Sequence, residues 1–491
     1  MNSNNNNSKG NLIRKATIIY VIGQFIMKGV NFFLIPLYTH KLGTVGFGQL
    51  SLIDMIYSFA TIFITIGIGS GYTRFYNEYK SEDEKRMLKN TTITFAIVLA
   101  VVITILGTIS SPIYSESLLH ITNSNFLMFL LLVRCATDQI IYILLIEYSM
   151  TYDAKKVVII ETLKVILSTV LIIILIDILK NGVMSIYMGY VIGNIPIMIY
   201  LFITQRKSFE ITINNKMLRK MSKYSIQLIP SGLSSVVLNL ADRYVIEYFC
   251  GLSTTGVYSL GYKIGMLIDP IFIDPFRRTF TPFKFSVCHN SDASEKLSSK
   301  YESYNILGIG IVFLISIFSK TLIGIISTPD FIDAYKIIPL ILISYFIYGK
   351  SQFYSLGMHV SNKTYYDAYV MIIGGVLNII LNIILVHYFG MYGATISTVI
   401  SYYIMNILYK KVSDKLSNYE FKITKKTIFM YLITIIIYAI YFALTLFIKS
   451  SILEFLFECI LAFLWISLID KLKIITVKSI VINIFSKYLR R

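Results

Sequence analysis

Long apolar blocks, each of about 20 residues, recur along the 491-residue sequence and limit the folds that it can adopt. A helix of that length is what a chain needs to cross the hydrocarbon core of a membrane. Backbone N–H and C=O groups in lipid must be satisfied within the segment, which favours helices. A transmembrane barrel would show shorter segments of alternating polarity. We therefore predict an all-α polytopic membrane protein.

The apolar blocks predict about fourteen transmembrane helices. Composition agrees, because 55% of the residues are hydrophobic and only 15% are charged, against about 25% charged in soluble domains. The predicted spans are residues 13–38, 47–72, 90–110, 125–150, 157–177, 183–204, 224–249, 254–276, 303–326, 337–360, 367–387, 392–409, 427–448 and 451–469.

Basic residues are distributed unevenly among the loops. Most of the 45 lysines and arginines lie in the N-terminal tail and in every second loop, and the intervening loops hold few. Lysine and arginine are enriched in cytoplasmic loops, so we predict that both termini are cytoplasmic and that the number of spans is even. The same distribution accounts for the net charge of +18, and we predict no nucleic-acid partner.

An internal repeat with an offset near 210 residues runs through the sequence. Gly46 aligns with Gly256, and the turn at Gly182 falls within one residue of Gly393 under this shift. The first twelve spans therefore form two six-helix copies, followed by two extra helices. Six is an even number, so the copies keep one orientation in the membrane, and parallel repeats of this kind bind a transported substrate between the halves.

The repeat divides the sequence into segments. The last of them alternates apolar and basic residues, which suits either an amphipathic helix on the membrane surface or a partly ordered tail. The predicted segments are a disordered cytoplasmic tail (1–12), a first lobe (13–204), a cytoplasmic linker (205–223), a second lobe (224–409), two further helices (427–469) and a basic cytoplasmic tail (470–491).

Charged residues inside the predicted spans are candidates for a transport pathway. A charge near the bilayer centre costs roughly 2.5–3.5 kcal/mol, so such residues usually face a polar cavity. Cations without a local partner predict an anionic substrate such as a phosphate. The candidates for substrate binding are Lys28, Arg134, Asn239, Asp242, Arg243, Lys263 and Lys350.

Helical spacing leaves a second interpretation open for some of these charges. Arg134 and Asp138 lie four residues apart on one helix face, so a structural ion pair is the alternative there. Asn239, Asp242 and Arg243 form a polar stripe to which the same alternative applies. Lys28, Lys263 and Lys350 lack such a partner at i±3 or i±4. Lys164 is expected to reach the membrane surface.

The eighth predicted span contains two Asp-Pro pairs, Asp269-Pro270 and Asp274-Pro275. Proline inside a helix removes a backbone hydrogen bond and bends the helix, so this span is a candidate gating element. The sequence contains no metalloprotease or nucleophile motif, and its four cysteines are far apart. We predict a protein that is not an enzyme and has no cofactor, metal site or disulfide framework.

Several motifs resemble one family. They are the run from Pro36 to Gly43 continuing to Ser51, Tyr72-Thr-Arg74-Phe-Tyr, Asn239-Leu-Ala-Asp-Arg-Tyr-Val-Ile246 and Gly256-Val-Tyr-Ser-Leu-Gly-Tyr262. These segments are similar to polysaccharide-export flippases of the MATE-like exporter superfamily. The resemblance implies a V-shaped pair of six-helix lobes that alternates between inward-open and outward-open states in the bacterial inner membrane.

The resemblance also implies a substrate, undecaprenyl-diphosphate-linked oligosaccharide repeat units for O-antigen or capsule assembly. Its diphosphate and sugars would lie in a basic cavity. By matching positions, Arg74, Asp242 and Arg243 belong to the substrate site, and Lys28 lies where relatives often place a basic residue. A proton or sodium gradient would drive transport through Asp138 or Asp269. A polysaccharide polymerase and a chain-length regulator are the expected partner proteins, beside membrane lipids.

Three other functions are alternatives to this one. A lipid II flippase also needs basic residues for a diphosphate, so it is the nearest alternative. A multidrug or small-molecule exporter of the same superfamily generally has an acidic cavity, which the basic bias disfavours. A membrane polymerase would have a large periplasmic loop and no duplicated six-helix unit, whereas the predicted outward loops are short.

Overall fold

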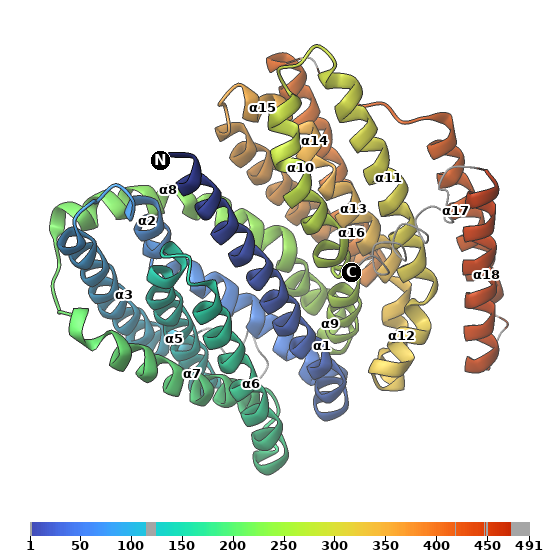
Figure 1. Cartoon of the computed structure of the whole chain (residues 1–491). Coiled ribbons are helices and arrows are strands. Elements are labelled where there is room, and N and C mark those ends of the chain that lie inside the picture. Colours follow the sequence, from blue (N-terminus) through green and yellow to red (C-terminus); the bar gives the residue numbers. More distant parts are fainter. Residues whose placement is uncertain (1, 114–123, 418, 446, 448–449, 473–491) are drawn as a thin grey trace. The chain divides into compact units, whose positions relative to one another are not determined.

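The computed structural model describes residues 2–113, 124–417, 419–445, 447 and 450–472, and every regular element in this part of the chain is a helix (Figure 1). The α-helices are α1 (Asn2–Phe63), α2 (Ile68–Phe75), α3 (Glu82–Ser110), α5 (Ser124–Met150), α6 (Ala154–Leu179), α7 (Val183–Gln205), α8 (Asn215–Leu240), α9 (Asp242–Gly265), α10 (Asp274–Val287), α11 (Ala293–Ile317), α12 (Ser319–Ile326), α13 (Ile338–Gly349), α14 (Ser351–Tyr354), α15 (Leu356–Val360), α16 (Tyr365–Leu416), α17 (Lys425–Thr445) and α18 (Ser451–Lys471). The shorter helices are η1 (Ser111–Ile113), η2 (Arg206–Ser208), η4 (Pro329–Lys336) and the π-helix η3 (Asp269–Ile273).

Eight described helices are long and apolar enough to cross a membrane, and two bent helix pairs pass the same test. Two of the eight, α1 and α16, each contain two helices joined at a kink, at Gly43 and Gly390. The prediction of an all-α, multi-pass membrane protein is confirmed, whereas the number of fourteen spans and the cytoplasmic termini stay predictions. Helix α1 begins at Asn2, so the segment predicted to be a disordered tail (1–12) is helical from Asn2 onward. The backbone hydrogen bonds of a helix join residues only four apart in the sequence. Most of the predicted basic tail lies outside the described residues.

The chain divides into two compact units, which are described separately. The first comprises the residues up to 247 together with 251–256, and the second comprises the remainder. The linker predicted at 205–223 lies inside the first unit, because α8 packs against α2, α1 and α3. Gly71 of α2 permits this contact, since a Cβ there would stand 2.9 Å from the carbonyl oxygen of Met221 in α8.

Four glycines with positive φ support the internal repeat and correct its register. Gly43 (φ 63°, ψ −173°) and Gly251 (φ 81°, ψ 171°) have nearly the same conformation and stand 208 residues apart. Gly182 (φ 54°, ψ −124°) and Gly390 (φ 54°, ψ −137°) are a second pair with that spacing. Glycine adopts positive φ without a steric penalty, so the turns persist where the neighbouring side chains differ. The offset is thus 208 rather than 210.

The same spacing of 208 relates two glycines at a close backbone crossing in the first unit. A Cβ on Gly48 would collide with the carbonyl oxygen of Leu252, and a Cβ on Gly256 would collide with that of Thr44. Thr44 and Leu252 are themselves 208 residues apart, so the contact is reciprocal. Small residues let membrane helices approach in this way.

Helices α6 and α7 of the first unit pack along each other through small residues. A Cβ on Gly193 would stand 2.8 Å from the Cα atom of Ser168, and one on Gly189 would stand 2.9 Å from the backbone nitrogen of Ile172. Helix α5 packs against α7, and α1 packs against α6. This arrangement brings α1, α5, α6 and α7 together (Figure 1).

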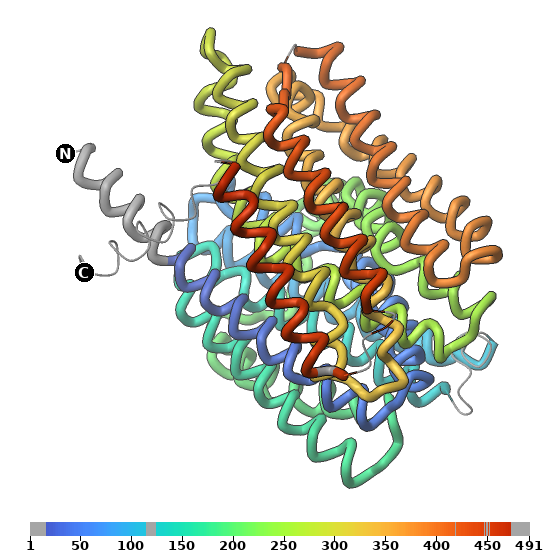
Figure 2. The backbone as a smooth tube through the Cα atoms, turned by 90° about the vertical axis from the view of Figure 1, so that its right-hand side faces the viewer, coloured from blue at the N-terminus to red at the C-terminus, as the bar shows by residue number. Residues whose placement is uncertain are grey.

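In the second unit the last two helices lie side by side, as Figure 2 shows, and pack against α11. The single tryptophan of the chain, Trp465 of α18, stacks on Phe313 of α11 with ring centroids 4.9 Å apart. Its indole Nε1 donates a hydrogen bond to Thr434 Oγ1 of α17 at 2.9 Å. One side chain therefore joins all three helices.

Candidate functional site

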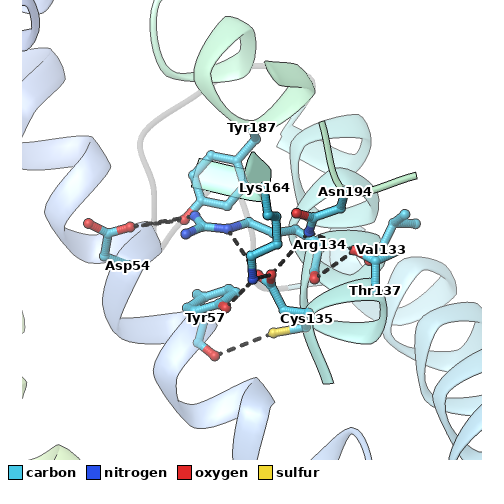
Figure 3. Close-up of polar contacts among 10 residues, drawn as sticks. Asp54, Tyr57, Val133, Arg134, Cys135, Thr137, Lys164, Tyr187 and Asn194 are labelled. Atoms are coloured by element: carbon cyan, nitrogen blue, oxygen red, sulfur yellow. Dashed lines mark hydrogen bonds and ion pairs between the residues drawn. The ribbon is translucent and has the colours of Figure 1, made fainter. Parts of the chain in front are cut away.

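A cluster of charged and tyrosine side chains lies among four helices of the first unit (Figure 3). Its centre is Arg134 of α5, whose Nε lies 3.7 Å from Asp138 Oδ2. Its Nη1 lies 4.0 Å from Asp54 Oδ1 of α1. The ion pair between Arg134 and Asp138, which sequence spacing left open as an alternative, is therefore present.

Asp138 is the most fully bonded member of this cluster. It accepts hydrogen bonds from Lys164 Nζ at 2.8 Å, from the Tyr57 hydroxyl at 2.8 Å and from Asn194 Nδ2 at 3.1 Å. Lys164 of α6, expected to extend to the membrane surface, turns into the unit because a carboxylate there compensates its charge. The four charged side chains are two cations and two carboxylates, so the cluster is balanced.

The Arg134 guanidinium is surrounded by aromatic rings. Its Cζ lies 3.6 Å from the ring centroid of Tyr190, 4.2 Å from that of Tyr57 and 5.0 Å from that of Tyr187. Buried Nε and Nη1 have no hydrogen-bond partner among the described residues, since both carboxylates are beyond hydrogen-bond distance. Arg134 thus has charge partners but keeps two donors for a further acceptor.

Asp54 connects the cluster to its more exposed side. It accepts a hydrogen bond from the Tyr187 hydroxyl at 3.2 Å, and its side chain is 37% exposed, against 13% for Arg134. Asp54 is therefore the most exposed of the four charged side chains of the cluster.

The predicted stripe of Asn239, Asp242 and Arg243 forms a second group in the first unit. Arg243 Nη1 donates to the Asn239 carbonyl oxygen at 2.6 Å and to Asp242 Oδ1 at 3.0 Å. The Arg243 side chain is only 4% exposed. The structure therefore brings these three residues together as a buried ion pair.

Arg74 lies just outside the predicted spans, at the end of α2. Its Nη1 donates to Glu78 Oε1 at 2.9 Å, and Lys220 of α8 donates to Glu78 Oε2 at 2.6 Å. The hydrogen bond from Lys220 lowers the pKa of the Glu78 carboxyl below its usual value, and the Arg74 charge adds to this. Lys28 is exposed on α1 and has no partner among the described residues.

In the second unit, Lys350 lies between α13 and α14. Its Nζ lies 4.7 Å from the ring centroid of Phe346 and within 5.9 Å of those of Tyr301 and Tyr431. It makes no ion pair within the described part of the chain. Its environment is therefore aromatic, as is that of Arg134, but Arg134 also has the carboxylates of Asp54 and Asp138 beside it.

The other two candidates of the second unit, Lys263 and Asp269, lie at the predicted gating element. Lys263 is in the last turn of α9, and Asp269 opens the π-helix η3 that precedes α10. The predicted bend coincides with this π-helix, which contains Pro270. Asp274 accepts hydrogen bonds from Arg277 at 2.7 Å and from Arg278 at 2.9 Å.

Sequence reasoning missed the uncharged members of the Arg134 cluster, because it assigned the tyrosines to packing and to the membrane interface. A signal existed on α7. Tyr187, Tyr190 and Asn194 follow at i, i+3 and i+7 and so share one helix face. Asp54 and Tyr57 of α1 are likewise three residues apart.

Nothing in the described residues suggests a metal centre. No three histidine, cysteine, aspartate or glutamate side chains gather into a group able to hold a metal ion. All four cysteines, which lie in this part of the chain, are free.

Known structures share this fold. The chain superposes on the lipid II flippase MurJ in an inward closed conformation with a TM-score of 0.71 and 16% identity, covering 94% of this chain and 99% of that one. An inward-facing multidrug resistance MATE family transporter of the MOP superfamily gives a TM-score of 0.56 and 14% identity, over 80% and 94%. The chain therefore shares its fold with these two proteins.

The sequence relatives have low identity to this chain, although one of them matches it over most of its length. The membrane protein MJ1068 of Methanocaldococcus jannaschii is 23% identical over 465 residues, which are 86% of this chain and 87% of that protein. The probable low-salt glycan biosynthesis flippase Agl15 of Haloferax volcanii is 23% identical over 197 residues, 39% of this chain and 41% of that protein. Residues 13–286, more than half of the chain, match the family model for polysaccharide biosynthesis proteins. The chain belongs to this polysaccharide biosynthesis protein family.

Proposed function

We propose that the protein flips undecaprenyl-diphosphate-linked oligosaccharide repeat units across the membrane by alternating access, for O-antigen, capsule or exopolysaccharide synthesis. Family membership supports a role in polysaccharide assembly. The relative Agl15 bears the name of a probable low-salt glycan biosynthesis flippase, which supports a lipid-linked glycan as the substrate class. The transporter fold supplies a means of moving it.

Arg134 is the observation that carries the proposal at the level of residues. Its guanidinium is buried among tyrosine rings and retains two N–H donors without an acceptor in the described residues. A diphosphate offers acceptor oxygens in the planar, paired arrangement that a guanidinium binds best. Tyr57, Tyr187 and Tyr190 add apolar faces with hydroxyl groups, a combination that suits a polar ligand with partly apolar surfaces.

The remaining candidates take supporting roles in this proposal. Lys28 and Lys350, which have no carboxylate partner in the described residues, would attract the diphosphate along its path. Lys263 would act with them, and Arg74 would meet the lipid-linked substrate at the cytoplasmic end. Arg243, held by Asp242 and Asn239, would become a ligand only after its ion pair opens.

The energy source belongs to the proposal as well. Asp138 and Asp269 are the candidates for proton or sodium coupling. Asp138 is balanced by Lys164 and Arg134, so a substrate phosphate that draws Arg134 away would leave this carboxylate freer to take up a cation. Substrate binding would then favour uptake of the coupling ion at Asp138.

A flipping assay in proteoliposomes tests the proposal. Undecaprenyl-diphosphate-linked oligosaccharide is loaded, and its appearance in the outer leaflet is followed with an impermeant glycosidase. We expect Arg134→Gln to lower the flipping rate at least tenfold and Arg134→Lys to lower it less, because lysine keeps the charge and loses the planar donor pair. Arg219→Gln, the same charge change at an exposed residue of α8, is the matched control.

Two results would oppose the proposal. Unchanged flipping by Arg134→Gln, with a normal amount of membrane-inserted protein, would remove Arg134 from the substrate path. Flipping of lipid II but not of the oligosaccharide-linked lipid, measured in parallel, would favour the lipid II alternative, whose diphosphate is the same and whose head group differs.

A further inference from the structure

A cleft opens between α6 and α7 at one end of the first unit. The distribution of lysine and arginine among the loops predicts that this end is cytoplasmic. The volume of the cleft is about 490 Å³, within the range of small-molecule sites. It is separate from the Arg134 cluster, because the lining residues include none of that cluster. The cleft therefore needs its own explanation.

One row of residues on α6 gives the cleft its polarity. Lys155, Ile159 and Leu163 are spaced four apart and so lie on one face of α6. From the lysine to the leucine this row covers about 12 Å of helix. It runs from the charged end of the helix toward the membrane interior.

The walls of the cleft are apolar and exposed. Ile159 is 46% exposed and Leu163 is 52% exposed, while Tyr200 on the α7 side is 49% exposed. Both helices meet the length and hydropathy expected of membrane spans, so such side chains face lipid rather than water. An acyl chain fits this environment, and a soluble anion does not.

The charged end of the cleft holds two lysines and one carboxylate, so it has an excess of positive charge. Neither Lys155 nor Lys156 makes an ion pair among the described residues. Asp153, the only acidic lining residue, accepts a hydrogen bond from the Lys156 backbone nitrogen at 3.2 Å and so caps α6. Lys156 Nζ lies 4.0 Å from the ring centroid of Tyr148, which holds the ammonium beside the cleft. An anionic head group would balance the two lysines and the helix N-terminus.

We propose that this cleft binds one anionic phospholipid, with its phosphate at Lys155 and Lys156 and an acyl chain along Ile159, Leu163 and Tyr200. Basic pockets between membrane helices on the cytoplasmic side recognise anionic head groups in this way. The lipid covers the apolar walls that packing between α6 and α7 leaves open. Its phosphate supplies a negative charge to two lysines that make no ion pair among the described residues.

Native mass spectrometry of the full-length protein, stripped of lipid in neutral detergent, tests this proposal without measuring transport. Phosphatidylglycerol and phosphatidylcholine with the same acyl chains are titrated separately. We expect one tight site that prefers phosphatidylglycerol. The double variant Lys155→Gln/Lys156→Gln should weaken that site roughly tenfold to thirtyfold. Leu163→Trp should weaken it too, because it fills the cleft and keeps both lysines.

Lys410→Gln/Lys411→Gln is the matched control, since it removes two exposed charges from the end of α16 without touching the cleft. It should bind phosphatidylglycerol as the unaltered protein does. Equal binding of the two lipids, unchanged binding by the Lys155/Lys156 variant, or equal weakening by the control would overturn the proposal. Displacement of phosphatidylglycerol by an equimolar polyprenyl diphosphate would assign the cleft to the substrate carrier and would overturn it as well.

Discussion

The two repeats share a backbone plan and differ in interior chemistry. Arg134 and Asp138 of the first unit stand 208 residues before Leu342 and Phe346 of the second. Leu342 is fully buried, as is nearly all of Phe346. The positions that hold a charge network in one unit are therefore occupied by apolar side chains in the other.

Aromatic residues complete this replacement. Tyr262, Tyr345 and Tyr402 stand 208 residues after Asp54, Thr137 and Asn194, in that order. The hydroxyls of Tyr262 and Tyr345 are 3.1 Å apart, and the rings of Tyr345 and Tyr402 lie 6.1 Å apart. The glycine turns outlasted the duplication because they depend on backbone conformation alone, whereas the interior side chains diverged. We infer that ligand chemistry is concentrated in the first unit.

Replacing Arg134 by leucine, the residue at the equivalent position of the second unit, should have the largest effect on stability. Arg134→Leu leaves Asp54 and Asp138 with Lys164 as the only cation of the cluster, which we expect to cost about 3 kcal/mol of stability. The measurement is thermal unfolding in detergent. The double variant Arg134→Leu/Asp54→Asn restores the charge balance and should regain part of that loss without regaining flipping. An unaltered melting temperature for the single variant would contradict the ion-pair network.

The shared backbone plan can be tested at the glycine crossing, where the expected effect is somewhat smaller. Gly48→Ala and Gly256→Ala each place a Cβ against a carbonyl oxygen and should destabilise the protein by about 1–3 kcal/mol. Because the contact is reciprocal, the two losses should be similar. Gly29→Ala is the control in α1, since nothing lies within 4 Å of the added carbon. Tolerance of one crossing variant but not of the other would break the symmetry.

Removing one tyrosine hydroxyl from each unit tests whether the two units differ in function. Tyr57→Phe removes the hydroxyl that donates to Asp138, and Tyr345→Phe removes the hydroxyl beside Tyr262. Each should cost only about 0.6 kcal/mol of stability, the usual value for a hydrogen bond between membrane helices. Only Tyr57→Phe should slow flipping, severalfold, in the proteoliposome assay. Equal slowing by both would indicate that the second unit also contacts the substrate.

The smallest expected effect concerns Glu78, outside the membrane. Its hydrogen bond with Lys220 lowers the pKa of this carboxyl in the folded state, so the contact between α8 and the turn after α2 stabilises the protein above the unfolded-state pKa. That contribution disappears as the pH falls through the lower folded-state value. Solvent screens this exposed group, so the change in melting temperature with pH should be slight. Glu78→Gln should flatten it, and an unchanged pH slope would count against the contact.

Several features of the fold and site could be read from the sequence because they depend on local physics. Apolar blocks form helices that satisfy their own backbone hydrogen bonds, proline removes one such bond at the Asp-Pro bend, and glycine allows positive φ at the repeated turns. All three features recur in the structure. The pairing of Arg134 with Asp138 was open to prediction for the same reason, since four residues make one helical turn. The register of the repeat was wrong by two residues, because short glycine motifs align at more than one offset.

Tertiary structure alone decided which distant side chains meet. Lys164 lies 26 residues from Asp138 in the sequence, and Tyr57 lies 81 residues from it, yet both donate hydrogen bonds to that carboxylate. Helix periodicity shows which face a residue occupies but not which helix lies opposite, since that depends on packing of several helices at once. The sequence by itself therefore determined a multi-pass helical protein with internal charges. The close approach of α1, α5, α6 and α7 determined which of those charges are balanced. It also left two N–H donors of Arg134 without a hydrogen-bond acceptor among the described residues.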